Sequence, residues 1–382
     1  MRPIYLDYNA TTPVDPLVLE AMLPYLCEHF GNPSSSHPYG VQARLGVEQA
    51  RRQVATLLGG EPDEIVFTGS GSEANNLALK GIAEAYRDRG DHIITSQVEH
   101  PAVLEPCRYL ERRGFRVTYL PVDNYGMVDP DAVARAITPG TILITMMHAN
   151  NEVGTIQPIA AIGRIARAHG IPFHTDAAQS VGKIPTRVDE LQVDLLTVVG
   201  HKFYAPKGVG ALYVRRGLQV ESLIHGASHE GGRRASTENV AGMVGLGEAC
   251  RLAGENLAET AGRLRELRER MHQGLMQQGV KLALNGHPTE RLPNTLNLSF
   301  SGLDSNSLLA ALPEVAASTG SACHAGETEP SAVLLAMGTP REQALGAVRF
   351  SLGRWTTAEE VDQAVTFLVE RLRTLSGESR RG

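Results

Sequence analysis

A carboxylate and an amine stand just after two short apolar runs of the chain. Asp176 follows the run 171–175, and Lys202 follows the run 195–199 after two intervening residues. Apolar runs rich in β-branched residues and bounded by glycine, proline and charged residues are typical of buried strands in a parallel sheet. Ligands of open α/β sheets bind just beyond the strand ends. We therefore expect the two side chains to converge on one small molecule.

Pyridoxal phosphate (PLP) is a cofactor that requires such a pair. A lysine holds its aldehyde as a Schiff base, and a carboxylate keeps its pyridine nitrogen protonated, so that the ring withdraws electrons from the substrate. An arbitrary Asp and Lys would more often be two unrelated residues at the starts of loops. The sequence around this pair, residues 174–180 and 200–208, decides between the two interpretations.

Residues 174–180 and 200–208 resemble the cofactor-binding segments of the cysteine desulfurases, the NifS-like and IscS-like enzymes among the class V aminotransferases of fold-type I. Further matches lie at 7–12 and 349–354, so the resemblance covers nearly the whole chain. It implies an α/β fold with a large PLP-binding domain, 13–258, built on a mostly parallel seven-stranded sheet. Residues 1–12 and 259–382 would form a smaller α+β domain that contains the catalytic cysteine.

A glycine- and serine-rich turn at 69–73 joins a predicted strand, 64–68, to a helix that runs to Ala85. Small residues at a helix N-terminus let backbone N–H groups approach a phosphate, although an ordinary capped turn has the same pattern. The resemblance favours the phosphate site. It implies that the cofactor is bound by Gly71, Ser72, His100, Asn151, Asp176, Gln179, His201 and Lys202.

Two segments differ from the commoner family pattern. Val199 stands where many desulfurases have a serine that contacts the phosphate, and selenocysteine lyases are more similar to this chain there. The loop 226–239 matches one that reaches the phosphate of the neighbouring subunit through a hydroxyl, here Thr237, although Ala227 and Ser236 replace commoner glycines. Thr237 therefore implies a homodimer with shared sites.

Cys323 follows an apolar stretch, 316–323, which we expect to be a strand that leads into a small polar loop. A nucleophile that passes sulfur to an acceptor benefits from a loop position, and the resemblance identifies Cys323 as that nucleophile. Cys27, Cys107 and Cys250 have apolar, helix-like surroundings and are expected to act as small buried hydrophobes. The four cysteines show no paired spacing of a disulfide framework or metal site.

Arg349 and Asn151 match the residues that bind the substrate carboxylate in the family. Arginine can hold a carboxylate through two parallel hydrogen bonds. We expect Arg349 to lie between the end of a helix and the start of a strand. His100 and Lys202 would move protons, since a histidine titrates near neutral pH.

The remaining periodicity predicts an alternation of strands and helices, which is typical of a mostly parallel sheet. Expected strands are 92–96, 117–121, 141–147 and 293–300, and expected helices are 13–30, 41–58, 159–169, 240–278 and 305–312.

Composition is that of a soluble globular protein. Of the 382 residues 42% are hydrophobic and 20% charged, and the net charge of -6 argues against nucleic acid or an anionic membrane as a partner. No apolar stretch approaches the length of about 18 residues that spans a bilayer, and no leader is evident. We expect a cytoplasmic protein.

The sequence thus predicts a cysteine desulfurase that converts L-cysteine to L-alanine and passes the sulfur through a persulfide to an acceptor protein, such as an iron–sulfur scaffold or a thiolation protein. The nearest alternative is a selenocysteine lyase that acts on L-selenocysteine. A transaminase of the same fold would not need Cys323. A non-catalytic scaffold that kept the fold would be supported by Val199 and the altered loop at Ala227.

Overall fold

The structure is a computed structural model of the chain, and it describes residues 2–319, 322–324 and 327–375. Side chains are described for all of these except 322–324, 327 and 328. Among the helices in these ranges, none is both long and apolar enough to cross a bilayer.

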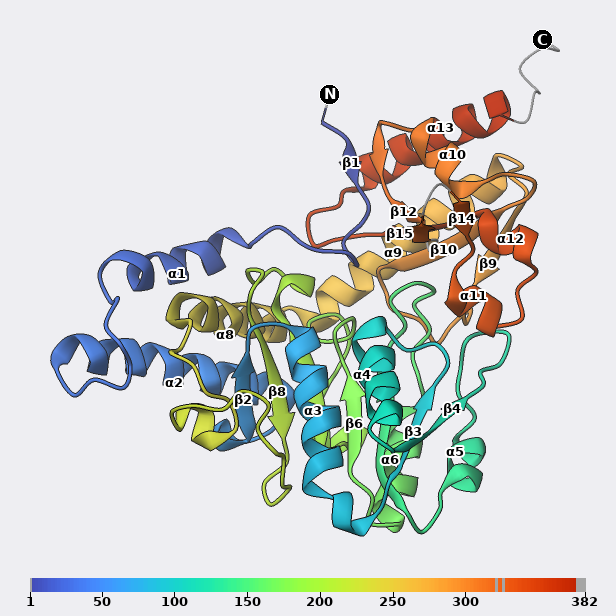
Figure 1. Ribbon diagram of the computed structural model, residues 1–382. Helices are drawn as coiled ribbons and strands as arrows, with labels where there is room; N and C mark the ends of the chain where they lie inside the picture. Colours follow the sequence, from blue (N-terminus) through green and yellow to red (C-terminus); the bar gives the residue numbers. More distant parts are fainter. Residues whose placement is uncertain (1, 320–321, 325–326, 376–382) are drawn as a thin grey trace.

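A seven-stranded sheet with the order β2-β8-β7-β6-β5-β3-β4 forms the larger part of the molecule (Figure 1). The strands from β4 to β7 are parallel, whereas β8 runs antiparallel to both β7 and β2. The predicted mostly parallel sheet is confirmed. Its strands are β2 (Ile65–Thr68), β3 (His92–Ser96), β4 (Arg116–Leu120), β5 (Thr141–Met147), β6 (Phe173–Asp176), β7 (Leu195–Val199) and β8 (Gly210–Val214).

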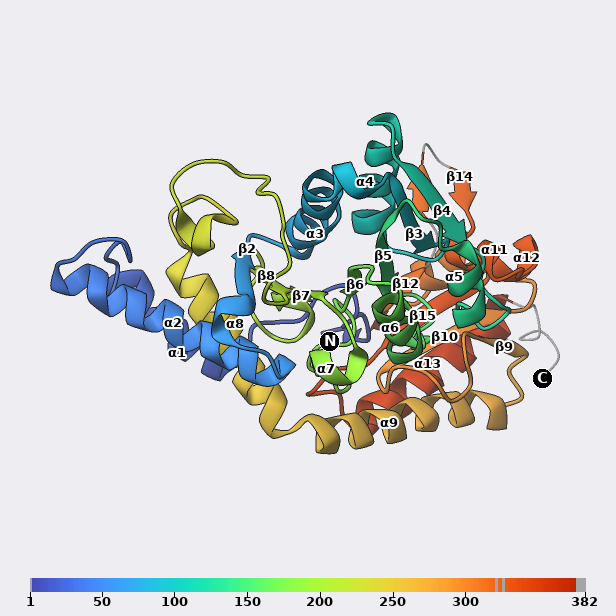
Figure 2. The same cartoon turned by 90° about the horizontal axis from the view of Figure 1, so that it is seen from below.

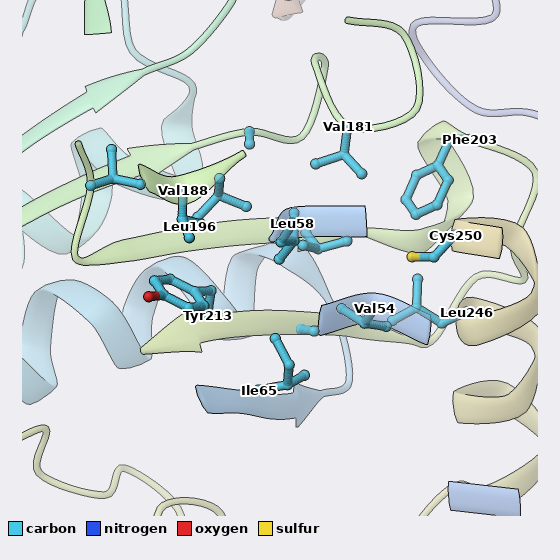
Figure 3. Packing of buried hydrophobic residues seen from close by; sticks show 14 of the residues in the cluster. Val54, Leu58, Ile65, Val181, Val188, Leu196, Phe203, Tyr213, Leu246 and Cys250 are labelled. Carbon is cyan, nitrogen blue, oxygen red and sulfur yellow. The ribbon is translucent and has the colours of Figure 1, made fainter. Parts of the chain in front are cut away.

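Helices cover both faces of this sheet, so its strands are apolar on both sides. Val66 and Leu212 pack under α3 (Gly71–Ala85) and α4 (Pro101–Arg112), whereas their neighbours Ile65 and Tyr213 face the opposite layer. That layer contains α1 (Pro16–Cys27), α2 (Pro38–Leu58), α5 (Pro130–Ala136), α6 (Ile159–Ala168), α7 (Val188–Leu191) and α8 (Val240–Glu255). Figure 3 shows how side chains from β2, β8 and the helices α2 and α8 interlock in it.

A second hydrophobic cluster lies in the C-terminal region, around the antiparallel sheet β12-β15-β10-β9. Ile4 and Leu6 of the entry segment belong to this cluster, and β1 (Ile4–Tyr5) pairs with β11 (Val315–Ala316). The division into domains 13–258 and 1–12 with 259–382 stays a prediction. The other elements are β9 (Leu282–Asn285), β10 (Thr295–Phe300), β12 (Ser318–Thr319), β13 (Ala322–His324), β14 (Glu327–Glu329), β15 (Ala347–Ser351), α9 (Leu257–Gln277), α10 (Ser305–Ala310), α11 (Ala332–Ala336), α12 (Arg341–Leu345) and α13 (Ala358–Leu375).

Three expectations about local structure were wrong. The predicted helix 240–278 is two helices, because the backbone at Asn256 leaves the helical region (φ -123, ψ 16) and α9 sets off in a new direction (Figure 2). The predicted strand 316–323 is divided among β11, β12 and β13. Arg349 lies in the middle of β15, where its backbone pairs with β10 on one side and with β12 on the other.

Cys27 is the fourth correction, because it is exposed at the last position of α1. Its apolar neighbours Leu23 and Leu26 are themselves about half exposed, so apolar neighbours in sequence did not indicate burial here. Cys107 and Cys250 are buried as expected.

Candidate active site

Nine of the predicted site residues line one cavity of about 420 Å³. The cavity lies where β5, β6 and β7 end and α3 begins, at the edge where parallel strands present their carboxyl ends. Residues from the C-terminal region complete its wall. The nine are Gly71, Ser72, His100, Asn151, Asp176, Gln179, His201, Lys202 and Arg349.

Asp176, the last residue of β6, is only 5% exposed. Its Oδ2 accepts a hydrogen bond of 2.7 Å from Asn75 Nδ2, and its Oδ1 accepts one of 2.9 Å from the backbone N–H of Ala178. Both oxygens of this side chain are therefore held by donors. Asn75, on α3, also lines the cavity but was missed in the sequence, where it is one of two adjacent asparagines with no distinguishing pattern.

Lys202 ends the short turn Gly200–Lys202 that follows β7. Its Nζ donates to the main-chain carbonyls of Asn9 at 2.8 Å and Ala10 at 2.7 Å. Burial, followed by the charge of Arg349, lowers the pKa of the amine to about 8, while Asp7 and Asp176 act in the opposite direction. A lysine in this state is neutral often enough near neutral pH to act as a nucleophile or base.

His100 caps the N-terminus of α4 and is exposed on its cavity side. Its Nδ1 accepts a hydrogen bond of 3.0 Å from the backbone N–H of Ala102, which places the proton of the neutral ring on Nε2. Desolvation by the surrounding protein, followed by the charge of Lys202, lowers the pKa of His100, against the influence of Asp176. His100 is therefore a neutral imidazole with a free N–H.

An anion-binding end is formed by the first turn of α3. The Ser70 hydroxyl caps the helix by accepting from Glu73 N–H at 3.1 Å, and Gly71 and Ser72 line the cavity beside it. The dipole and backbone N–H groups of a helix N-terminus favour a bound phosphate. A Cβ on residue 71 would lie 2.2 Å from Val199 Cγ2, so the side chain that replaces the family's serine requires glycine at this turn.

His201, next to the lysine, also faces this end of the cavity. Its Nδ1 lies 3.1 Å from the Thr11 hydroxyl, and burial, with the charges of Lys202 and Lys207, lowers its pKa to about 4. A neutral His201 can donate one N–H to an anion without adding positive charge.

Arg349 is 8% exposed and lines the cavity. Its Nη2 pairs with Asp7 Oδ1 at 2.7 Å, and its Nη1 donates to the carbonyl of Asn151 at 2.9 Å. Among the residues that the structure describes, its buried Nε has no hydrogen-bond partner. The two bonds to Asp7 and Asn151 leave one further hydrogen on each of Nη1 and Nη2, and a guanidinium of this kind suits a bound carboxylate.

A buried polar network that the sequence did not reveal joins these groups. Asn9 accepts from Gln179 Nε2 at 2.9 Å on its carbonyl and from Lys183 Nζ at 3.2 Å on its amide oxygen. Lys183 also donates to Gln179 Oε1 at 2.7 Å, which fixes the amide with its NH₂ group directed away from that lysine. Burial, then the charges of Lys202 and Arg349, lowers the pKa of Lys183 well below its usual value.

Two predicted residues, Thr237 and Cys323, are not among those that the structure places at the cavity. Thr237 is exposed and is not among the residues that line it. The backbone at Cys323 belongs to β13, which pairs with β14, but the side chain lies outside the described part of the chain.

The donor set fits PLP. An amine of lowered pKa, a carboxylate held as an acceptor, a helix N-terminus and an arginine line one cavity, so each polar part of the cofactor and of an amino-acid substrate has a matching group. Asp176 and Lys202 line this cavity together, and the charge of Asp176 acts to raise the pKa of Lys202.

Known proteins match the chain over almost its entire length. The family model described as Aminotransferase class-V matches residues 4–364. The cysteine desulfurase IscS of Dictyoglomus turgidum is 50% identical over 380 residues, which cover 98% of this chain and 96% of that protein. The human cysteine desulfurase is 47% identical over 378 residues, which cover 98% and 83%.

Solved structures agree. A NifS-like protein superposes with a TM-score of 0.91 at 41% identity, covering 99% of this chain and 100% of the other. A structure of SspA in complex with cysteine gives 0.81 at 39% identity, covering 92% and 99%.

The chain therefore belongs to the class V aminotransferases, a family of PLP-dependent enzymes. Within that family its relatives are cysteine desulfurases, and the resemblance inferred from the residues is confirmed.

Proposed function

We propose that this chain is a PLP-dependent cysteine desulfurase that uses Lys202, His100 and Cys323. The observation that supports it is the convergence of nine predicted residues on one cavity, in a chain about half identical to proteins named cysteine desulfurases. When bound, PLP supplies an electron sink for the bonds of the substrate's α-carbon. The protein supplies binding, proton transfer and the nucleophile.

Arg349 binds the substrate carboxylate through the second hydrogens of Nη1 and Nη2, since Asn151 and Asp7 each take only one hydrogen from these two nitrogens. Asn151 lines the same wall. Lys202 Nζ takes the α-proton of the substrate and returns it, and His100 Nε2 moves a proton at the substrate amine. Gln179 donates to the ring hydroxyl, and Asp176 accepts from the pyridine nitrogen.

Sulfur transfer needs no external oxidant or reductant. The Cys323 thiolate attacks the substrate sulfur, forming an S–S bond. The C–S bond breaks, its electron pair stays on the β-carbon, and that carbon takes up a proton to give alanine. Cysteine and the enzyme thiol thus become alanine and an enzyme persulfide.

Persulfide trapping tests the proposal. The protein is loaded with PLP, mixed with L-cysteine and alkylated. The mass of the peptide that contains Cys323 is then measured by mass spectrometry. We expect one added sulfur atom on Cys323 and an equal amount of alanine. Lys202→Ala and Cys323→Ala should abolish the persulfide, and Cys27→Ala should not. A protein that binds PLP and releases keto acid without needing Cys323 would be a transaminase instead, and one that cannot bind PLP would be a scaffold.

Val199 is the observation that favours a second candidate, selenocysteine lyase. It is buried against Gly71, so a phosphate contact from a hydroxyl at this position is replaced by an apolar one. Steady-state rates on L-cysteine and L-selenocysteine separate the candidates. Turnover of selenocysteine alone would refute the desulfurase.

We further propose a homodimer with shared sites. Several large apolar side chains on and near α1 are exposed, among them Leu26 at 58% and Phe30 at 67%, and a second copy of the chain would cover them. Figure 1 shows α1 at the far end from the C-terminal region. Thr237, exposed and outside its own cavity, is then available to the phosphate of the neighbouring subunit.

The persulfide sulfur would pass to an acceptor protein in the cytoplasm. Relatives named IscS support an iron–sulfur scaffold as that acceptor. Mixing the persulfide-loaded enzyme with a purified scaffold protein and following loss of the Cys323 persulfide tests this step.

A further inference from the structure

The segment that contains Cys323 is attached at one end to Arg349 and at the other to Glu152, the residue that follows Asn151. On one side, Ser318 of β12 pairs with Arg349 of β15. On the other, the Ser331 hydroxyl donates a hydrogen bond of 2.5 Å to Glu152 Oε2. Glu152 directly follows Asn151, whose carbonyl accepts from Arg349.

The turn around Glu152 is itself held from several directions. Its N–H donates to Asn150 Oδ1 at 2.9 Å, and its carbonyl accepts from Asn297 Nδ2 on β10 at 3.1 Å. The preceding carbonyl, of Asn151, also accepts from Asn9 Nδ2 at 3.2 Å. These hydrogen bonds fix the backbone of the turn, so the Glu152 side chain starts from a fixed position.

Ser331 is equally well placed, because it is 2% exposed and caps α11 by accepting from Leu334 N–H at 3.2 Å. Leu334 of that helix belongs to one hydrophobic cluster with Val98 and Val153, which lie in the segments that follow β3 and β5. Figure 1 shows α11 at the junction of the large sheet and the C-terminal strands. The Ser331 hydroxyl therefore serves two structures, the helix cap and the contact with Glu152.

We propose that Glu152 is a positioning residue for sulfur transfer: by bonding Ser331 it ties the start of α11, and with it the segment of Cys323, to the turn that meets the substrate carboxylate. Burial raises the pKa of Glu152, while Ser331 and then Arg349 counter that rise, so the carboxylate depends on both partners. The inference rests on the proposed function, because it assigns Glu152 to the step in which Cys323 attacks.

Single-turnover kinetics tests the inference. Holoenzyme is mixed with L-cysteine, substrate binding is followed by the absorbance of the cofactor, and the Cys323 persulfide is quantified by mass in quenched samples. Glu152→Ala should slow persulfide formation about ten- to a hundredfold, the worth of one hydrogen bond to a charged group, and should change the affinity for L-cysteine by less than about threefold. Glu152→Gln keeps an acceptor oxygen and should restore most of the rate.

Three controls separate positioning from general damage. Glu152→Ala should keep the Leu334 amide protected from hydrogen exchange, because the cap remains, whereas Ser331→Ala should expose it. The double variant should be no slower than the slower single variant, since both remove one interaction. Ser305→Ala removes a buried hydroxyl that has no hydrogen-bond partner among the described residues. It should change neither the rate of persulfide formation nor the affinity for L-cysteine.

Two results would overturn the inference. If wild-type protein forms the persulfide and Glu152→Ala forms it at the same rate, the inference fails alone. If Glu152→Gln is as slow as Glu152→Ala, the acceptor oxygen is not what matters, and the inference fails as well. A wild-type protein that forms no persulfide would refute the proposed function and the inference with it.

Discussion

Glu99 allows a quantitative test of how burial keeps a carboxyl group protonated beside the site. It is buried at the end of β3, beside His100, and its Oε1 accepts from the Ser96 hydroxyl at 2.6 Å and from Met147 N–H at 3.0 Å. Its Oε2 has no partner among the residues that the structure describes. Burial raises the pKa of Glu99 to about 8, and the charge of Asp176 adds to the rise while both hydrogen bonds oppose it.

Glu99→Gln should therefore raise the free energy of unfolding most at high pH. The unfolded chain ionises Glu99 near its ordinary pKa of 4.5, whereas the folded chain holds the proton until about pH 8. Between these values the folded state binds more protons, so the wild-type free energy of unfolding falls as pH rises. The slope is about 1.4 kcal/mol per pH unit, which over this interval amounts to at most about 5 kcal/mol. Glutamine keeps the acceptor oxygen and does not titrate.

Urea denaturation of the cofactor-free protein at pH 5.5, 7 and 8.5 measures the effect. Glu99→Gln should be about 1.4 kcal/mol more stable than wild type at pH 5.5, one pH unit above the ordinary pKa, and this advantage should grow until about pH 8. Glu99→Met, which leaves Met147 N–H without its acceptor, should be destabilised at every pH. A carboxylic-acid C=O band in the infrared spectrum, present in wild type at pH 7 and absent in Glu99→Gln, would show the proton directly. A constant stability difference between wild type and Glu99→Gln across this pH range would refute the reasoning.

Three further predictions follow from the geometry. In the cofactor-free protein, Lys202 should react with an amine-modifying reagent with a midpoint near pH 8, and Arg349→Met should raise that midpoint because it removes a positive charge. Arg349→Lys keeps the positive charge but loses the two parallel N–H donors of the guanidinium. The pH midpoint of Lys202 modification should therefore stay the same, while kcat/KM for L-cysteine falls about tenfold or more. Unchanged kcat/KM would exclude Arg349 as the carboxylate anchor. Leu26→Glu should give a monomer in light scattering, with weaker PLP binding, whereas Glu20→Gln on the same helix should not; a dimeric Leu26→Glu would place the interface elsewhere.

The parts of the site that the sequence predicted are side chains at strand ends. Asp176 and Lys202 follow strands whose apolar runs are unambiguous, and β3, β5 and β7 begin and end where the pattern placed them. Parallel strands bring such ends to one edge, so local patterns were enough to predict a long-range convergence. The identity of each contact, however, came from the family resemblance rather than from spacing.

Arg349 shows where local patterns fail. Its apolar neighbours Val348 and Phe350 suggested a helix end followed by a strand, but they are alternate inward-facing residues of β15, and the arginine points the other way. The alternation of apolar and polar residues in this strand is visible in the sequence. The sequence does not show which strands pair with it, because β10 and β12 are distant along the chain. The same lack of a local partner hid Glu152 and Ser331.

Asn9 is the residue that the sequence could least have indicated, and its position explains why the entry segment is needed at all. Its main-chain carbonyl accepts hydrogen bonds from Lys202 and Gln179, and its side-chain oxygen accepts one from Lys183. Its side-chain NH₂ group donates to the carbonyl of Asn151. One residue thus connects several of the groups that form the site. Most of these bonds use the backbone or a neutral amide, which have no charge pattern to detect. Because Lys202 is held by two carbonyl oxygens rather than by a carboxylate, its amine gains acceptors without gaining a counter-ion, and burial and Arg349 are free to lower its pKa.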